Sequence, residues 1–184
     1  MKRLAIALAL AGTCVLGSTI APAPAAALET YQAQMEASDA ASQARVDMID
    51  AFGPKAVKPG HYLWRDVPAS AGPERVVIGL SDQMAYLYRG DTLVAAASIS
   101  TGKDSKPTPV GVFSVISKTP MHRSKKYDNA PMPFAQFFDP AGIAMHAGYN
   151  PGYAASHGCV RLPSAFAKKL YSVTDVGTPV YVGA

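Results

Sequence analysis

The 184-residue sequence has no internal repeat, no low-complexity tract, no glycine-rich phosphate loop and no Asp-rich calcium loop. It gives no basis for a repeat architecture, a nucleotide-phosphate site or a calcium site of those types. Charged residues make up only 16% of the chain and hydrophobic residues 49%, which excludes wholesale disorder. Fifteen Gly and fifteen Pro supply many turns, so the composition indicates a turn-rich globular protein.

Residues 1–27 have the pattern of a secretory signal peptide. Lys2 and Arg3 precede an apolar stretch, and small residues at 21–27 provide Ala-x-Ala cleavage sites. A membrane anchor is the alternative, but Gly and Pro interrupt the apolar stretch and no basic stop follows it. Cleavage after Ala27 leaves 157 residues with a net charge of +2 instead of +4 and no membrane span. We therefore expect an exported protein, in a periplasm or outside a cell wall, that does not bind nucleic acid.

Cleavage would also leave a single cysteine. Cys14 lies in the leader, and Thr13 before it does not fit a lipoprotein signal, which needs a small residue at that position. Cys159 then has no partner for an internal disulfide, although an exported protein meets an oxidising environment. An unpaired thiol in that setting needs a functional explanation.

Patterning divides the remaining chain into two parts. Residues 28–52 are rich in Ala, Gln, Glu and Met without proline, which predicts a helix. Its larger apolar residues are only loosely spaced for one face: Tyr31, Met35, Val46 and Ile49. Residues 53–72 are predicted to form a linker with a short extended piece, so we expect a helical extension over 28–72 and a main domain over 73–183.

The main domain has the pattern of a β protein. Strands are predicted at residues 75–80, 83–88, 93–100, 110–117, 143–146 and 179–182. Residues 164–170 predict a short helix after Pro163. Short strands about a dozen residues apart indicate an antiparallel sandwich or barrel rather than a parallel α/β sheet.

Two histidines, the single remaining cysteine and an arginine lie within sixteen positions, from His146 to Arg161. A thiol attacks as its thiolate, and at its usual pKa of about 8.5 it is mostly protonated at neutral pH. A neighbouring imidazole or positive charge supplies the activation it needs. Gly158, just before Cys159, leaves the backbone free of side-chain bulk, so main-chain N–H groups can face an oxyanion.

Three other interpretations of this segment fit its residues less well. Taken alone, Cys159 is explained as a small buried hydrophobe, but Ser-His-Gly-Cys is not an apolar core pattern. His146, His157 and Cys159 are enough ligands for zinc, but they lack the paired spacings of known zinc sites. Ser156 lacks the Gly-x-Ser-x-Gly turn of a serine nucleophile. Nucleophilic chemistry at Cys159 is the preferred hypothesis, with no metal or other cofactor.

The motif resembles a known family. His146 followed by Ser-His-Gly-Cys-Val-Arg at 156–161 is similar to the signature of the L,D-transpeptidase catalytic domain, also called the YkuD domain, of bacterial cell-wall enzymes. Residues 80–88 resemble that domain's opening hairpin, residues 100–113 its next strands, and residues 177–180 its closing strand. The resemblance implies a β-sandwich-like domain that transfers an acyl group from the tetrapeptide stem of peptidoglycan.

The resemblance also implies roles for individual residues. Cys159 would attack the carbonyl before the terminal D-Ala, releasing D-Ala and leaving a thioester that an amine resolves. His146 would be the base and then the acid, with the carbonyl of Ala147 orienting its imidazole. Ser156, His157 and Gly158 would shape the oxyanion site, and Arg161 would hold the loop or a stem carboxylate.

Further residues are expected in the cleft, and the second half of the reaction is open. Tyr127, Met132, Phe134 and Gln136 precede the motif in a stretch that resembles the family's lid or cleft rim. Tyr149 and Tyr153 flank Pro-Gly in the motif loop and would line the donor channel. The thioester can pass to an amine, forming a crosslink, or to water, trimming the stem. A binding module that has lost catalysis is the non-enzymatic alternative.

Overall fold

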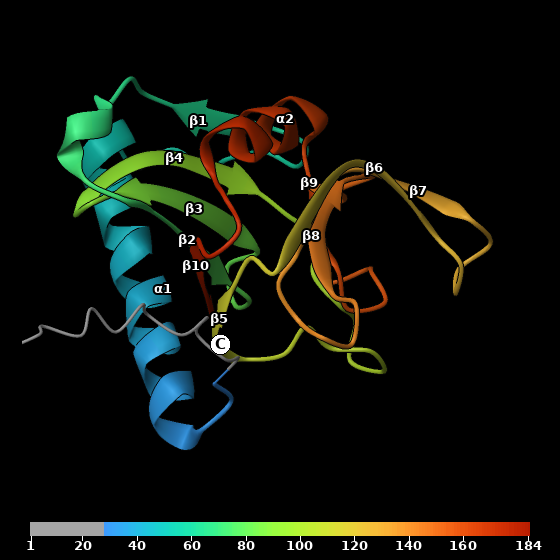
Figure 1. Cartoon of the computed structure of the whole chain (residues 1–184). Helices are drawn as coiled ribbons and strands as arrows, with labels where there is room; N and C mark the ends of the chain where they lie inside the picture. Colours follow the sequence, from blue (N-terminus) through green and yellow to red (C-terminus); the bar gives the residue numbers. More distant parts are fainter. Residues whose placement is uncertain (1–27) are drawn as a thin grey trace, which may run out of the picture.

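The computed structural model describes residues 28–184 and contains two β-sheets and two α-helices (Figure 1). The first sheet has six strands in the order β1-β4-β3-β2-β10-β5. Their bounds are Tyr62–Trp64 for β1, Glu74–Gly79 for β2, Met84–Arg89 for β3, Thr92–Ser98 for β4, Gly111–Ser114 for β5 and Pro179–Gly183 for β10. The second sheet has four strands in the order β6-β7-β8-β9. Their bounds are Ser117–Ser124, Ala130–Phe137, Ala144–Ala147 and Val160–Leu162. The helices are α1 (Tyr31–Phe52) and α2 (Ser164–Val173).

The predicted mainly β, sandwich-like fold is confirmed, but the sheets are mixed rather than purely antiparallel. The β2–β3 and β3–β4 pairs are antiparallel hairpins, as alternating strands joined by short turns predict. β10 runs parallel to β2, and β9 runs parallel to β8. In each case the chain between the two strands is long enough for a crossover, which a parallel pair requires.

The first sheet is buried on both faces because neighbouring residues of its strands belong to different cores. Val76 and Ile78 of β2 pack in a core that includes residues of the second sheet and α2, whereas Val77 packs in a second core with α1. In β3, Leu87 belongs to the first core and Tyr86 to the second. Successive strand residues point to opposite faces, so a continuous apolar run fills both cores. Burying each such side chain contributes roughly 1.5–3 kcal/mol.

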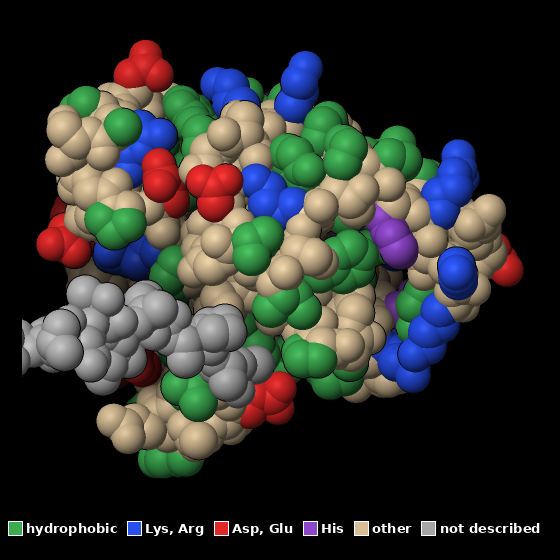
Figure 2. Space-filling view, in the orientation of Figure 1, with side chains coloured by type: hydrophobic (Ala, Val, Ile, Leu, Met, Phe, Trp, Pro, Cys, Tyr) green, Lys and Arg blue, Asp and Glu red, His purple; other side chains and the backbone are tan. Residues whose placement is uncertain are grey.

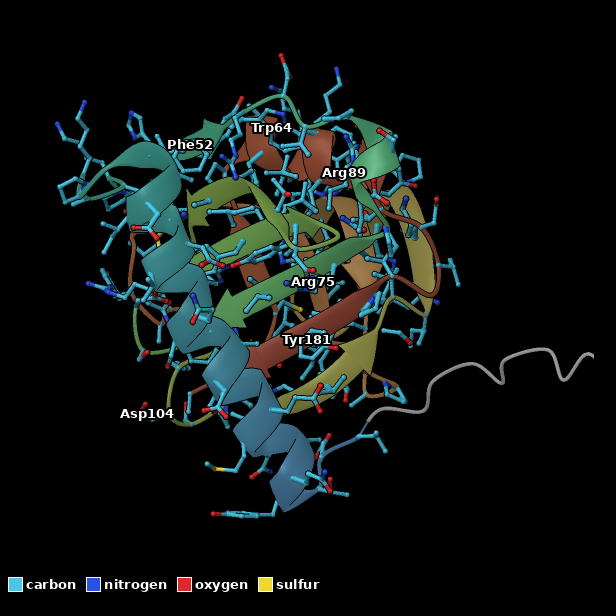
Figure 3. The ribbon with its side chains drawn as sticks, turned by 90° about the vertical axis from the view of Figure 1, so that its left-hand side faces the viewer. Phe52, Trp64, Arg75, Arg89, Asp104 and Tyr181 are labelled. Carbon is cyan, nitrogen blue, oxygen red and sulfur yellow. The ribbon has the colours of Figure 1, made fainter. Side chains whose placement is uncertain are left out.

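Helix α1 packs on the outer face of the first sheet mainly through small residues (Figure 3). Its buried positions are Ala33, Ala37, Ala41, Ala44 and Met48. Tyr31, Met35, Val46 and Ile49 are exposed instead. The helix lies very close to the sheet where Ala37 faces Gly183 of β10. A Cβ built on Gly183 would stand 2.3 Å from the carbonyl oxygen of Ala37, so there is no room for a side chain at Gly183. Bulkier residues on this face would force the two elements apart.

The segment over residues 28–72 is joined to the sheet at three places. Strand β1 pairs with β4, Leu28 bridges to Val112, and Tyr88 donates a hydrogen bond of 2.6 Å from its hydroxyl to Asp47 of α1. The ring of Trp64 meets Phe166 of α2 edge-on at 6.3 Å. This segment therefore supplies the β1 edge strand and one cover of the sheet. None of the helices within residues 28–184 is long and apolar enough to cross a membrane.

Residues 117–137 form a long β-hairpin, whose strands the sequence pattern does not predict beyond residue 117. β6 and β7 pair over almost their whole length, from Ser117 with Phe137 to Ser124 with Ala130. Pro131 and Pro133 lie in β7, and proline normally argues against a strand because it cannot donate to the ladder. Only the last residues of β7 pair with β8, so the prolines lie where β7 has a free edge. The hairpin therefore projects beyond the sheet (Figure 1).

Candidate active site

The alternation of side chains along β8 and β9 builds the site. Met145 of β8 and Leu162 of β9 point into the core between the sheets. The residues between core positions point the other way, which places His146 and Arg161 on the opposite face, and these two are register partners in the parallel pair. Cys159 directly precedes β9 and is half-buried on the same face. Strand β8 and the start of β9 thus place the imidazole, the guanidinium and the thiol on one surface.

A cleft of about 960 Å³ opens over this face. Its walls come from the loop before β5, the β6–β7 hairpin, the β7–β8 turn and the motif loop between β8 and β9. Of the predicted site residues, those that line it are Cys159, His146, Ser156, His157, Arg161, Tyr127, Met132 and Tyr149. The size is in the range of ligand-binding pockets.

Opposing influences act on the Cys159 thiol. Burial raises its pKa above the ordinary value, because a thiolate is poorly solvated there. A backbone hydrogen bond from Ala144 and the positive charge of Arg161 lower the pKa, but by less than burial raises it. The thiol is therefore mainly protonated at neutral pH, and a base must accept its proton when it attacks.

His146 is buried and held in one orientation. Its Nδ1 lies 2.9 Å from the carbonyl oxygen of Ala147, and because a carbonyl only accepts, Nδ1 carries the hydrogen. Nε2 is then left with a lone pair. Burial lowers the pKa of His146, and the charges of Arg161 and His122 lower it further, against the Ala147 hydrogen bond, which raises it. The imidazole is thus neutral at neutral pH, the form in which it can accept a proton.

Within residues 28–184, no hydrogen bond joins the Cys159 thiol to His146. The groups that favour its thiolate are the Ala144 N–H and the positive charge of Arg161. Catalytic hydrogen bonds in unliganded enzymes are often long and tighten when substrate binds. The resting site holds a neutral thiol and a neutral imidazole on one face of the same sheet.

Ser156 and Gly158 fix the loop that carries the thiol. Ser156 Oγ donates to the carbonyl oxygen of Cys159 at 2.5 Å and accepts from the Gly158 N–H at 3.1 Å. The carbonyl oxygen of Gly158 accepts from Thr108 Oγ1 at 2.7 Å. Gly158 has φ +115°, a backbone conformation that residues other than glycine rarely adopt. The turn therefore requires glycine and sets the direction of the backbone next to the nucleophile.

The sequence of this chain was compared with models of known protein families. The sequence matches the model of the L,D-transpeptidase catalytic domain over residues 73–182, more than half of the chain. The chain belongs to the L,D-transpeptidase catalytic domain family.

Individual relatives are distant. The chain is 28% identical over 116 residues to the putative L,D-transpeptidase YkuD of Bacillus licheniformis, covering 60% of this chain and 66% of that protein. It is also 28% identical over 167 residues to L,D-transpeptidase 1 of Mycobacterium tuberculosis, covering 67% of this chain and 66% of that protein. The chain therefore spans slightly less than two thirds of the length of these curated relatives.

Solved structures have the same fold. An L,D-transpeptidase from Xylanimonas cellulosilytica superposes with a TM-score of 0.56 at 28% identity, covering 65% of this chain and 64% of that one. The L,D-transpeptidase LdtMt1, solved in complex with imipenem, superposes with a TM-score of 0.56 at 22% identity, covering 59% and 58%. The second likeness concerns the fold alone.

Within this L,D-transpeptidase domain, three residues expected in the cleft do not line it: Phe134, Tyr153 and Gln136. Phe134 packs on the core and on Tyr171 of α2, with ring centroids 5.9 Å apart. Tyr153 is exposed and does not line the cleft. Gln136 is buried and accepts a hydrogen bond from Thr174. The reason is local: Phe134 has φ +56°, which departs from regular strand geometry, and alternation turns Gln136 away from the cleft face.

His157 has a different surrounding from the one its place in the motif suggested. Its exposed ring stacks on Tyr127 of the β6–β7 turn, with centroids 4.5 Å apart and an interplanar angle of 20°. His122 lines the cleft as well, with its ring edge-on to Phe137 at 5.1 Å. The sequence gives no sign of this role for His122, because no local pattern predicts strand β6 or places its side chain in the same cleft as the motif.

In the described part of the chain, no three His, Cys, Asp or Glu side chains converge as metal ligands. Ala147 itself is buried in the core, so only its backbone takes part in the site.

Proposed function

We propose that this protein is an exported cysteine acyltransferase that acts on the tetrapeptide stems of peptidoglycan. It would release the terminal D-Ala through a thioester on Cys159 and pass the acyl group to an amine, forming or remodelling crosslinks in the cell wall. The observation that carries the proposal is the placement of Cys159, His146 and Arg161 on one face of the second sheet, in the wall of a single large cleft.

The first half-reaction begins with the neutral pair. Cys159 Sγ attacks the carbonyl carbon between the third stem residue and D-Ala while Nε2 of His146 takes the thiol proton. The negative charge that develops on the carbonyl oxygen would be met by backbone N–H groups near Gly158. The C–N bond then breaks, His146 returns the proton to the departing amine of D-Ala, and a thioester remains.

The second half-reaction reverses these roles. An incoming amine gives its proton to His146 and attacks the thioester carbonyl, so an amide forms and the thiol is restored. Water in place of the amine would give a shortened stem, which is the hydrolase alternative. Both outcomes use the same nucleophile and differ in what reaches the thioester.

Two further observations support this assignment. The related LdtMt1 is described in complex with imipenem, a carbapenem, and a cysteine nucleophile in this cleft would accept the same kind of acylating compound. The leader pattern at residues 1–27 fits an enzyme whose substrate lies outside the cytoplasm. These residues lie outside the part the structure describes, so export, to a periplasm or to the wall exterior, rests on the sequence.

The test is to incubate the purified protein with sacculi and analyse the muropeptides. New crosslinks accompanied by free D-Ala indicate the transpeptidase, and shortened stems without crosslinks indicate the hydrolase. The Cys159→Ala variant is the matched control and should leave the sacculi unchanged. Binding to sacculi without any product, by the parent protein and the variant alike, would identify a non-catalytic module instead.

A further inference from the structure

The cleft is lined by cations alone among charged side chains. Lys106 comes from the loop before β5, Lys125 and Lys126 come from the β6–β7 turn, and Arg161 comes from β9. Among the described residues that line the cleft there is no Asp or Glu. Figure 2 shows Lys and Arg side chains beside histidines at the end of the molecule where β6 and β7 lie.

This excess is a local feature rather than a consequence of overall charge. After the expected cleavage at Ala27, eleven of the fifteen remaining Lys and Arg lie outside the cleft, against thirteen Asp and Glu, so the four cleft cations account for the whole positive excess of +2. Acidic residues lie close in sequence, with Asp104 near Lys106 and Asp128 near Lys126, but neither lines the cleft.

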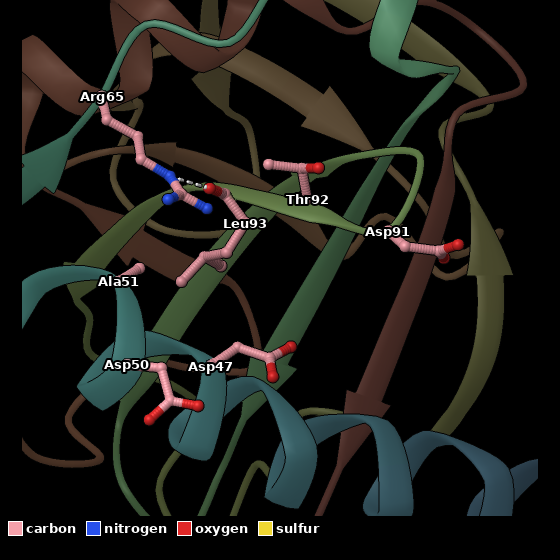
Figure 4. Close-up of a pocket in the computed structure, with 7 residues that line it drawn as sticks. All are labelled: Asp47, Asp50, Ala51, Arg65, Asp91, Thr92 and Leu93. Carbon is pink, nitrogen blue, oxygen red and sulfur yellow. Dashed lines mark hydrogen bonds between the residues drawn. The ribbon is translucent and has the colours of Figure 1, made fainter.

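A second pocket shows the opposite composition. It is smaller, about 300 Å³, and lies among α1, β4 and the β3–β4 turn (Figure 4). Asp47, Asp50 and Asp91 line it with Arg65 as its one cation. Hollows of this protein are therefore not cationic in general, and the charge of the active-site cleft is particular to it.

The cations are held at two depths. Arg161 is half-buried beside the thiol, and its guanidinium makes no hydrogen bond or ion pair within residues 28–184. Lys125 and Lys126 are exposed at the rim, where the Lys126 ammonium lies 5.9 Å from the ring centroid of Tyr127. Because Tyr127 stacks on His157 of the motif loop, the lysines of the turn stay over the same cleft as Cys159.

We propose that this cleft selects donor stems that carry several free carboxylates. Arg161 binds a carboxylate near the scissile bond, and Lys125 and Lys126 bind carboxylates further along the stem. This inference rests on the proposed function and specifies its substrate: a stem whose internal carboxylates are free, in preference to one whose internal carboxylates are amidated. Amidation leaves the shape nearly unchanged but removes the charge, so the discrimination is electrostatic.

The experiment compares two synthetic tetrapeptide stems ending in D-Ala, one with free internal carboxylates and one with those carboxylates amidated. D-Ala release gives KM and kcat at low and high ionic strength, and titration of Cys159→Ala gives Kd without turnover. We expect KM and Kd to be about fivefold lower for the free form at low salt, with similar kcat. High salt should remove most of this difference, because the lysines at the rim are exposed and screened.

Charge variants locate the effect. The double variant Lys125→Gln/Lys126→Gln should lose most of the preference, so that KM and Kd for the free stem approach the values for the amidated stem. The control Lys58→Gln/Lys168→Gln removes two exposed charges that do not line the cleft and should keep the preference in full.

The two hypotheses fail separately. Equal KM for both stems, with D-Ala released from each, overturns the carboxylate inference and leaves the proposed function intact. A Kd preference for the free form without D-Ala release by the parent protein supports the inference and contradicts the function. Equal Kd for both stems overturns the inference whether or not turnover occurs.

Discussion

Replacing Arg161 with Gln tests how the thiol is tuned. Arg161 follows Cys159 by two residues on the same face, which spaces their Cα positions by about 6.6 Å, and we take this spacing as the scale of the distance between the two charges. The attraction between guanidinium and thiolate at that separation is about 0.6 kcal/mol at the dielectric constant of water and about 2.5 kcal/mol at an effective value of 20. The thiolate population at neutral pH should therefore fall roughly threefold to seventyfold in the variant.

The assay is the rate of iodoacetamide alkylation as a function of pH, with peptide mapping to locate the label on Cys159. A thiolate of higher pKa is intrinsically more nucleophilic, which offsets about half of the loss on a logarithmic scale. The rate at neutral pH should thus fall by roughly twofold to tenfold, and the midpoint of the profile should move to higher pH.

Matched variants separate charge from other effects. Arg161→Lys keeps the positive charge and should keep a midpoint close to the parent value, and Lys168→Gln removes a remote charge and should not move it. A midpoint in Arg161→Gln equal to or below that of the parent protein would refute the role of Arg161 in stabilising the thiolate.

Three further predictions follow from individual contacts. His146→Ala should slow acylation of Cys159 by about 10²–10⁴-fold without unfolding the protein, and near-normal acylation in this variant would show that the base is misassigned. Because the pKa of His146 is lowered, acylation of the parent protein should stay constant through neutral pH and fall only below pH 6.5. His157→Ala should raise KM by releasing Tyr127, whereas His157→Phe, which keeps a ring to stack, should largely restore it; equal effects would argue against the stack. Ser156→Ala should lower the free energy of unfolding in urea by about 1–3 kcal/mol, because a buried N–H loses its acceptor, and unchanged stability would contradict the bracing role.

The sequence predicts the fold where local patterning and tertiary environment agree. Strands with continuous apolar runs, such as β2 and β3, lie within a residue of their expected positions because both of their faces are buried. The helix at 164–170 continues to residue 173. β9 was missed because three residues carry too little periodicity to reveal a strand.

Other features depend on pairings that no local pattern encodes. The packing face of α1 is not evident from the sequence, because its buried positions are mostly alanines rather than bulky apolar residues. The β6–β7 hairpin was missed because its prolines are tolerated only at an edge, and edges are a property of the assembled sheet. Of the site, the motif around Cys159 was visible in sequence, whereas the positions of Ala144, His122 and Lys126 were not.

The central claim is that Cys159 forms a thioester with the stem while D-Ala departs. Intact-mass spectrometry of the protein mixed with a tetrapeptide donor in the absence of an amine acceptor tests it most directly. We predict a mass increase equal to the donor less D-Ala, located on Cys159 and abolished by Cys159→Ala. Release of D-Ala by the Cys159→Ala variant, or an adduct on another residue, would contradict the account.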